Sequence, residues 1–401
     1  MRGARYLLVI VALGVSAFST AVDVTAKSAI VIDASSGKVL WSKDANAQMY
    51  PASTTKIMTG LLLVEKCRPT DTIVAPADIE TVKESSMHLK PGERVTARDM
   101  LYAIMLRSAN DGCYAIATHI SGSVGAFSKL MNERARQIGC THTHFDNPNG
   151  LNDVLHTTTA HDLALIAQTA MKYPAFREAV RTVKYEITRS INTKDRWMVN
   201  HDKLLKVDPT ADGVKTGYTV PAGHCFVGST TRNGFRVITV VMKSAHWQLD
   251  HETLVNWAFK SFEKKKKIAA GVIVGTVKVP GAGDKTVAVR VAQNAYTLGP
   301  IGPKADKDTV KLEPAKNLKA PIKKGDHVGD LVLKDADGWV QRVPVVADCS
   351  VAAEETTKRQ SPSAGSTYIF GGALFVGAVL MRSKVRRKTK YYGRTTTKQR
   401  R

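Results

Sequence analysis

Strand-forming segments lie at both ends of the first 265 residues, and the residues between them carry helical patterns. A hairpin is predicted within residues 28–43, where two apolar runs flank a turn that contains Ser35 and Lys38. The strand pattern returns from about residue 184, and a helix over 250–262 closes the region. Strands that enclose helices in this order predict a sheet packed against helices, so we expect an α/β or α+β domain with a helical subdomain over residues 27–266.

A change in composition near residue 268 marks a second domain. The segments that follow are short, rich in β-branched residues and separated by Gly, Pro and Asp. This pattern is typical of a small all-β domain, which we assign to residues 267–350. Residues 351–366 are rich in Ser, Thr, Glu and Ala, and they are predicted to form a linker.

The N-terminus carries the features of a secretory signal peptide, assigned to residues 1–26. Arg2 and Arg5 precede an apolar run, and small residues follow, with a cleavage site after Ala21 or Ala26. An uncleaved membrane anchor is the alternative interpretation of the same residues.

The C-terminus carries a predicted membrane anchor over residues 367–382. This apolar run is at the lower length limit for crossing a bilayer, and the basic tail 383–401 that follows contains no acid. An apolar segment followed by basic residues is typical of a stop-transfer helix with a cytoplasmic tail. We therefore expect an exported protein, anchored to the bacterial cytoplasmic membrane with its catalytic domain on the outer side. A helix lying in the membrane interface is the alternative.

The formal net charge of +23 suggests nucleic-acid binding at first sight. Ten of these positive charges lie in residues 382–401 and two in the signal peptide, which leaves +11 for the exported body. Much of the excess positive charge lies in the two terminal segments that are predicted to orient the chain in the membrane. We therefore predict no nucleic-acid partner. The remaining charge favours an anionic wall or membrane, or is simply a basic surface.

The cysteines and histidines predict neither a metal site nor a cofactor. The five cysteines have no close spacing, so one or two disulfides are possible but their pairing stays open. Four histidines between residues 142 and 161 lack the i,i+4 spacing beside an acid that zinc-binding helices use.

Ser53 and Lys56 form the strongest candidate for catalysis. Ser53 lies at the start of an apolar helix, after Pro51, and residues three apart share a helix face. An amine kept neutral at this position could take the proton of the serine. The Ser-x-x-Lys pattern also occurs at Ser35/Lys38, in the hairpin turn, and at Ser261/Lys264, on a surface helix, so context alone favours Ser53.

Two further segments supply polar groups that the Ser53–Lys56 pair lacks. Ser108 and Asn110 lie at a break between two apolar helices, where Ser108 could relay a proton while Asn110 binds a substrate carbonyl and holds Lys56. Alternatively, they only cap the following helix. Lys215 and Thr216 precede Gly217 in the single Lys-Thr-Gly of the chain, and they could bind a carboxylate while Gly217 lets backbone approach the substrate. An ordinary edge strand is the alternative.

Together, in this order, the three motifs are those of class A β-lactamases and penicillin-binding proteins. The chain resembles the low-molecular-mass penicillin-binding proteins, which are serine-type D-Ala-D-Ala carboxypeptidases of peptidase family S11. The resemblance covers roughly residues 25–350 and includes the β domain. It rests on the segments Pro51–Thr59, Arg107–Asp111, Phe145–Leu151 and Asp212–Thr219.

The resemblance implies a role for each motif residue. Ser53 would attack the carbonyl between the two terminal D-alanines of a peptidoglycan pentapeptide, and Lys56 would act as general base. Ser108 and Asn110 would assist proton transfer and hold substrate, while Lys215 and Thr216 would bind the terminal carboxylate. The backbone N–H groups of Ser53 and Tyr218 would form the oxyanion hole. β-Lactam antibiotics would be covalent inhibitors.

One departure and two alternatives remain open at this point. The resemblance leads us to expect an arginine near residues 245–249, and none is present, so Lys203 is a hypothetical substitute. A class A-like β-lactamase is disfavoured because no glutamate, the deacylating residue of that class, occurs between Arg134 and Arg177. A non-catalytic wall-binding homologue is disfavoured because all three motifs are intact.

Overall fold

The computed structural model describes residues 22–301, 308–335 and 339–354. Its central sheet has the strand order β2 (Val39–Lys43), β1 (Ser28–Asp33), β9 (Phe235–Ser244), β8 (Gly223–Arg232) and β7 (Ala211–Thr219). All four pairs are antiparallel. The predicted hairpin is present as β1 and β2, and β7 lies at an edge of the sheet.

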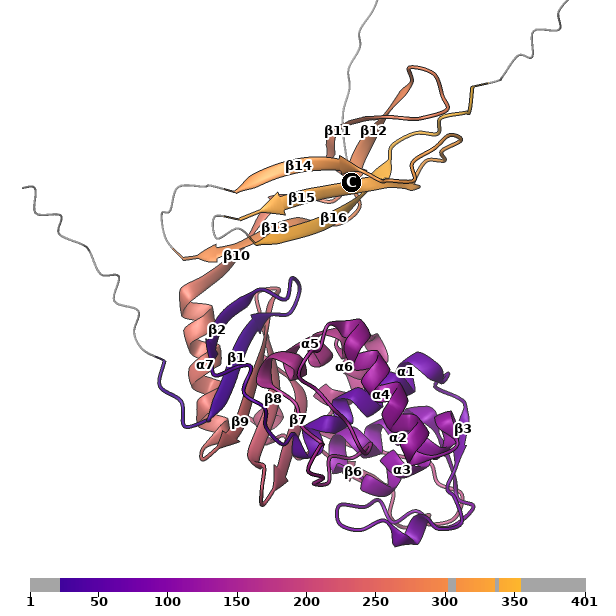
Figure 1. Ribbon diagram of the computed structural model, residues 1–401, viewed down its shortest axis with the longest axis vertical. Helices are drawn as coiled ribbons and strands as arrows, with labels where there is room; N and C mark the ends of the chain where they lie inside the picture. Colours follow the sequence, from indigo (N-terminus) through magenta and orange to yellow (C-terminus); the bar gives the residue numbers. More distant parts are fainter. Residues whose placement is uncertain (1–21, 302–307, 336–338, 355–401) are drawn as a thin grey trace, which may run out of the picture. The chain divides into compact units, whose positions relative to one another are not determined.

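Helices cover both faces of this sheet (Figure 1). Along β1, Ile30 and Ile32 belong to the core beneath α1 (Lys56–Lys66) and α5 (Ala160–Ala170), whereas Ala29 and Val31 belong to the core beneath α7 (Trp247–Ser261). Alternate strand residues point to opposite faces, so an apolar strand without polar alternation is what a sheet buried on both sides requires. The α+β architecture predicted from the sequence is confirmed.

The helical subdomain lies between β2 and β7 in the chain. It contains α1, α5 and the helices α2 (Ala97–Tyr102), α3 (Asn110–Ser121), α4 (Val124–Ile138) and α6 (Pro174–Arg181), with a π-helical turn η3 (Ala103–Arg107) after α2. The short elements are η1 (Ala52–Thr55), η2 (Ile79–Thr81), η4 (Lys203–Lys206) and the hairpins β3 (Thr72–Val74)/β4 (Arg94–Thr96) and β5 (Lys184–Glu186)/β6 (Trp197–Val199).

Threonine side chains cap two of these helices. The hydroxyl of Thr96 accepts a hydrogen bond from the Asp99 N–H, and that of Thr159 accepts one from the Asp162 N–H, both at 3.1 Å. Ser53, in contrast, lies in the 3₁₀ turn η1 that precedes α1 rather than in the α-helix itself.

The second region is all-β, as predicted. β10 (Phe262–Ile268) pairs with β13 (Ala295–Pro300). A five-stranded sheet has the order β11 (Ile273–Lys278), β12 (Thr286–Val291), β16 (Val340–Ala347), β15 (His327–Lys334) and β14 (Thr309–Pro314). The predicted boundary at 266/267 falls inside β10, because the lysines that follow the closing helix form a strand.

Several sequence predictions lie outside the described residues: most of the signal peptide, most of the linker 351–366, the anchor 367–382 and the tail 383–401. In the part of the chain that the structure does describe, no helix is both long and apolar enough to span a bilayer. At the N-terminal end, Val24 and Ala26 are buried, and Thr25 and Ala26 donate hydrogen bonds to the Asp250 carboxylate.

Candidate active site

Ser53 and Lys56 meet at the start of α1. Pro51 begins the turn η1, and the chain reaches Lys56 one turn later at the first residue of α1. The Nζ of Lys56 lies 2.9 Å from Ser53 Oγ, within hydrogen-bond distance. The structure therefore brings together the two side chains that the sequence analysis paired.

The Lys56 amine is fully buried among neutral oxygens. Besides Ser53 Oγ, it donates to Asn110 Oδ1 at 2.8 Å and to the Asn149 carbonyl at 2.6 Å. Burial lowers the pKa of Lys56 to about 8, although the negative charges of nearby groups partly oppose this shift. A neutral Lys56 keeps two N–H donors for the two amide oxygens and can direct its lone pair at the Ser53 hydroxyl.

Asn110 joins Lys56 to the loop that precedes β4. Its side-chain amide donates to the Lys83 carbonyl at 3.1 Å, and its backbone N–H donates to the Ser85 carbonyl at 2.7 Å. The N-cap of α3 is Ala109, and no side chain caps this helix. Asn110 therefore holds Lys56 instead of serving as the helix cap that was the alternative.

Ser108 is buried in the left-handed conformation, with a φ of +63°, at the end of the π-helical turn η3. Its hydroxyl makes no hydrogen bond to any residue in the described ranges. The structure thus brings Ser108 to the break beside Asn110, while a relay through its hydroxyl stays a prediction.

Strand β7 passes directly beside Ser53. A Cβ atom added to Gly217 would lie 3.0 Å from the Ser53 backbone nitrogen and 3.2 Å from the Pro51 carbonyl. A glycine is thus required for this close approach. The sequence analysis predicted that Gly217 would let the backbone approach the substrate. The structure shows that Gly217 lets strand β7 approach the Ser53 backbone.

Lys215 is the second buried lysine of the site. Its Nζ donates to the carbonyl of neighbouring Thr216 at 3.0 Å. Burial, together with the positive charge of Lys56, lowers the pKa of Lys215 to about 7. Tyr218, the next strand residue after Gly217, has a 58% exposed side chain that contacts the His224 ring.

Two supporting groups have no counterpart in the predicted site. The Asn149 carbonyl holds Lys56, and the buried His156 ring bonds to Thr55 Oγ1 at 2.9 Å. Because His156 Nδ1 accepts the Asp146 N–H at 3.0 Å, its Nε2 carries the proton that it donates to Thr55. The turn around Asn147–Gly150 was a visible signal, but it does not reveal which carbonyl faces inward.

The remaining candidates of the sequence analysis lie elsewhere. Lys203 is exposed on η4, and no hydrogen bond or ion pair connects it to the site within the described ranges. Residues 245–249, where an arginine was expected, lead into α7 through His246 and Trp247. Across the described residues, no group of three or more His, Cys, Asp or Glu side chains is arranged to hold a metal.

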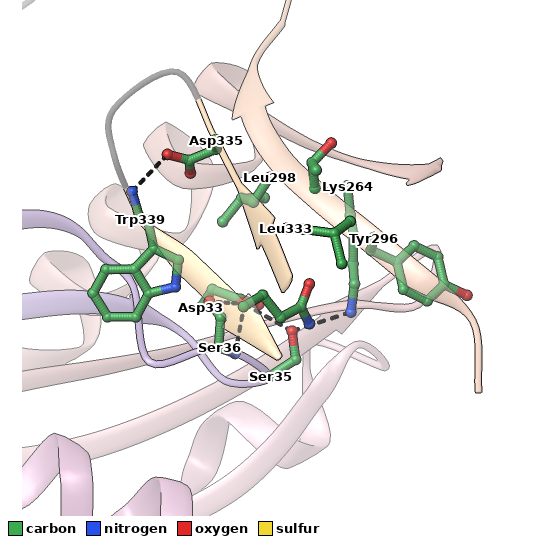
Figure 2. Close-up of a pocket in the computed structure, with 11 residues that line it drawn as sticks. Asp33, Ser35, Ser36, Lys264, Tyr296, Leu298, Leu333, Asp335 and Trp339 are labelled. Atoms are coloured by element: carbon green, nitrogen blue, oxygen red, sulfur yellow. Dashed lines mark hydrogen bonds between the residues drawn. The ribbon is translucent and has the colours of Figure 1, made fainter. Parts of the chain in front are cut away.

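The other two Ser-x-x-Lys motifs meet at a separate small pocket (Figure 2). There, the Ser35 hydroxyl donates to Asp33 Oδ2 at 2.7 Å and accepts from Lys264 Nζ at 3.2 Å. Lys38, three residues after Ser35, pairs with Asp335 at 2.5 Å. Both motifs are therefore engaged in polar contacts away from Ser53.

Family models match nearly all of the described chain. A D-alanyl-D-alanine carboxypeptidase family model, peptidase S11, matches residues 15–246. A model for the C-terminal domain of penicillin-binding protein 5 matches residues 262–353.

Individual relatives agree with these models. The chain is 34% identical to D-alanyl-D-alanine carboxypeptidase DacF of Bacillus subtilis, over 83% of this chain and 86% of the relative. It is 29% identical to DacA of Escherichia coli, over 81% and 83% of the two chains. The crystal structure of penicillin-binding protein 5 from Haemophilus influenzae is similar at a TM-score of 0.66 and 27% identity, covering 82% of this chain and 98% of the other. With its motif residues gathered around Ser53, the chain belongs to the D-alanyl-D-alanine carboxypeptidase family S11.

Proposed function

We propose that this protein is a serine-type D-Ala-D-Ala carboxypeptidase that removes the terminal D-alanine from peptidoglycan stem pentapeptides. The observation that carries the proposal is the buried Lys56 amine, 2.9 Å from Ser53 Oγ and surrounded by neutral oxygens. The family membership and the carboxypeptidase names of the relatives support the same activity.

Acylation begins with a neutral Lys56. Its lone pair takes the Ser53 proton while Ser53 Oγ attacks the carbonyl between the two D-alanines. The backbone N–H groups of Ser53 and Tyr218 stabilise the resulting oxyanion, and each such donor is worth roughly 2.7–4 kcal/mol in related sites. The proton then passes to the leaving D-alanine nitrogen. Ser108, two residues before Asn110, is the group that assists this transfer. Water later hydrolyses the Ser53 ester and restores the hydroxyl.

Substrate orientation depends on the open edge of the central sheet. Strand β7 has no partner on its outer side among the described strands, so an extended peptide can pair with it. Lys215 and Thr216 then bind the terminal carboxylate, and Asn110 holds the amide carbonyl on the other side of Ser53. β-Lactams enter the same site and leave a slowly hydrolysed acyl group on Ser53.

The proposed location is the outer side of the bacterial cytoplasmic membrane. The apolar N-terminal run, the apolar segment 367–382 and the basic tail support this location. A cut after Ala21 would retain Val24–Ala26, which pack into the fold, so it is preferred to a cut after Ala26. Fractionation of cells that express the full chain and a variant ending at residue 354 tests the anchor: only the full chain should sediment with membranes.

The activity is tested by the release of D-alanine from a wall pentapeptide, with and without penicillin. We expect the release of one D-alanine per peptide. Penicillin should inhibit this release and form a covalent adduct with Ser53. A penicillin adduct that turns over within seconds would instead support a β-lactamase. A protein that neither releases D-alanine nor binds penicillin would be a non-catalytic wall-binding homologue.

A further inference from the structure

The last described residue, Glu354, lies at one end of the β domain. Its backbone N–H donates to the Gly281 carbonyl at 2.8 Å, and just before it Val351 and Ile322 exchange two backbone hydrogen bonds of 2.8 Å. These bonds fix the point at which the chain leaves the β domain against two other loops. We call the surface formed there the exit surface, and it consists of residues 279–285, 315–326 and 348–354.

The exit surface carries lysines without acidic partners. Five exposed lysines lie on it: Lys285, Lys316, Lys319, Lys323 and Lys324. None of them forms an ion pair with a residue in the described ranges. In contrast, Lys265 and Lys267 on β10 each pair with a carboxylate at 2.9 Å. The charge of the β10 lysines is thus largely balanced, whereas that of the exit-surface lysines is not.

The acidic residues of the exit surface do not balance these lysines. Asp284 pairs with Lys278 at 2.9 Å, and Asp348 pairs with Arg290, so both carboxylates already have basic partners. Only the carboxylates of Asp326 and Glu354 remain to offset the five lysines. The exit surface therefore has an excess of three positive charges.

An open hollow of about 350 Å³ lies within this charged region. Lys316 and Lys319 line it, together with Asp326 and His327. One oxygen of the Asp326 carboxylate accepts the Lys323 N–H at 2.7 Å, so this carboxylate is partly engaged by the backbone. The hollow has room for a phosphate group, which lysine ammonium groups bind as point charges.

The length of the following chain limits what the exit surface can meet. Twelve residues, 355–366, separate it from the apolar segment 367–382, which is the proposed membrane anchor. Even a fully extended chain of this length spans only about 40 Å. An anchored protein therefore keeps the exit surface close to the bilayer, which favours the membrane over more distant wall polymers as its partner.

We propose that the exit surface docks on anionic lipid headgroups, with a headgroup phosphate in the hollow beside Lys316 and Lys319. The proposal rests on the membrane location proposed above. Attraction between a lysine and an anionic bilayer raises binding about fivefold per lysine, and it acts only within a Debye length of the membrane. Docking would give the β domain a defined orientation on the bilayer, which the anchor alone does not provide.

The test places a fluorescent label on Cys349, an exposed cysteine of the exit surface, in the otherwise full chain. Cys67→Ser removes the half-buried cysteine, and the other three cysteines are buried. The protein is incorporated into vesicles that carry a headgroup-attached quencher. We expect the label to be quenched about twofold more in vesicles with equal parts phosphatidylglycerol and phosphatidylcholine than in phosphatidylcholine alone. This difference should disappear in about 1 M salt, where the Debye length is about 3 Å.

A pair of double variants assigns the effect to the exit surface. Lys319→Gln with Lys323→Gln should lower the docking equilibrium constant roughly 25-fold, because two lysines are lost. The matched control is Lys265→Gln with Lys311→Gln, which removes two lysines of the β domain that pair with Glu263 and Glu313 at 2.9 and 3.7 Å. The control should dock like the unsubstituted protein. All variants should release D-alanine equally in solution, since these lysines lie outside the catalytic site.

The outcomes separate docking from the functions proposed above. Equal quenching in the two kinds of vesicle, or equal loss of docking in both double variants, would overturn the proposal while leaving the anchor intact. Retention of the protein on isolated cell walls that only the exit-surface variant loses, without any effect of lipid charge, would assign the lysines to a wall polymer and also overturn it. A full chain that associates with neither kind of vesicle would overturn the proposed location and the docking with it.

Discussion

Two Ser-x-x-Lys motifs of this chain contain a buried lysine, and the partners of the two amines differ in charge. Lys56 is 0% exposed and donates to the neutral oxygens of Ser53, Asn110 and Asn149. Lys38 is 6% exposed and forms an ion pair with Asp335. Burial destabilises the charged form of an amine that has no charged partner, whereas a nearby carboxylate stabilises that charged form.

The two serines differ in the same way. The Ser53 hydroxyl faces the amine that can take its proton, while the Ser35 hydroxyl donates to Asp33 Oδ2 and accepts from Lys264. One spacing thus produces a reactive pair where the surroundings are neutral and a structural pair where they are ionic. Chemistry at this motif is set by the partners, which the motif itself does not contain.

Replacement of the two serines tests the comparison most severely. Ser53→Ala should abolish covalent labelling by a fluorescent penicillin and lower D-alanine release by about 10⁴-fold or more, because the nucleophile is lost. Ser35→Ala should retain both activities. Labelling of Ser53→Ala at the native rate would mean that another serine is the nucleophile.

Replacement of the two lysines should separate catalysis from stability. Lys56→Met should slow acylation by about 10²- to 10⁴-fold through loss of the general base. Lys38→Met should acylate normally when folded but lose about 3–5 kcal/mol of unfolding free energy, because it removes the buried ammonium that pairs with the Asp335 carboxylate. Urea titration and the second-order acylation rate measure the two effects, and a folded Lys38→Met protein that fails to acylate would contradict the assignment.

The pH dependence of acylation should be bell-shaped, with an acid limb that reports on Lys56 and an alkaline limb that reports on Lys215. Catalysis requires neutral Lys56, with a pKa of about 8, and charged Lys215, with a pKa of about 7, so the rate should rise about tenfold per unit on the acid side and fall on the alkaline side. Lys215→Arg keeps its charge at high pH and should remove the alkaline limb. An alkaline limb that persists in this variant would exclude Lys215 as its source.

The smallest effects should come from two buried histidines. Burial lowers the pKa of both His156 and His251 to about 4, below the value near 6.5 of an unfolded histidine. Between these two values the unfolded chain binds more protons, so the free energy of unfolding should fall as pH falls from about 6.5 to about 4. Either His→Gln variant should flatten this slope, measured by urea titration at several pH values, and a slope unchanged in both variants would contradict the assignment.

The same two variants should differ in activity. His156→Gln should also slow acylation a few-fold, because His156 holds Thr55 beside Lys56, whereas His251 bonds to Thr239 behind the sheet. Equal acylation rates in the two variants would show that His156 has no influence on the Ser53–Lys56 pair.

Local signals made much of the fold predictable. The hairpin β1–β2 follows from its apolar runs and turn, and the caps at Thr96 and Thr159 follow from their own residues and the next three. The helix α6 and the strand β10 were missed. β10 carries four consecutive lysines, and its strand conformation depends on pairing with β13 rather than on its own composition.

The site was predictable where side chains act and hidden where the backbone acts. Ser53, Lys56, Asn110 and Lys215 carry distinctive functional groups, so their motifs were visible in the sequence. The carbonyls of Lys83, Ser85 and Asn149 are equally involved in holding the site, but every residue has a carbonyl. Only the folded path of the chain determines which of them faces Lys56 or Asn110.

The position of β1 inside the central sheet, between β2 and β9, has a consequence for how the chain folds. Ser28 pairs with Met242, and Thr25 and Ala26 bond to Asp250, so the first described strand completes its contacts only with some of the last residues of the catalytic region. Contacts this distant in sequence slow folding, because a long loop must close before they form. During synthesis β1 can pair early with β2, but its other edge therefore remains unpaired until almost the whole catalytic region has left the ribosome, and that edge is where a holding chaperone would act.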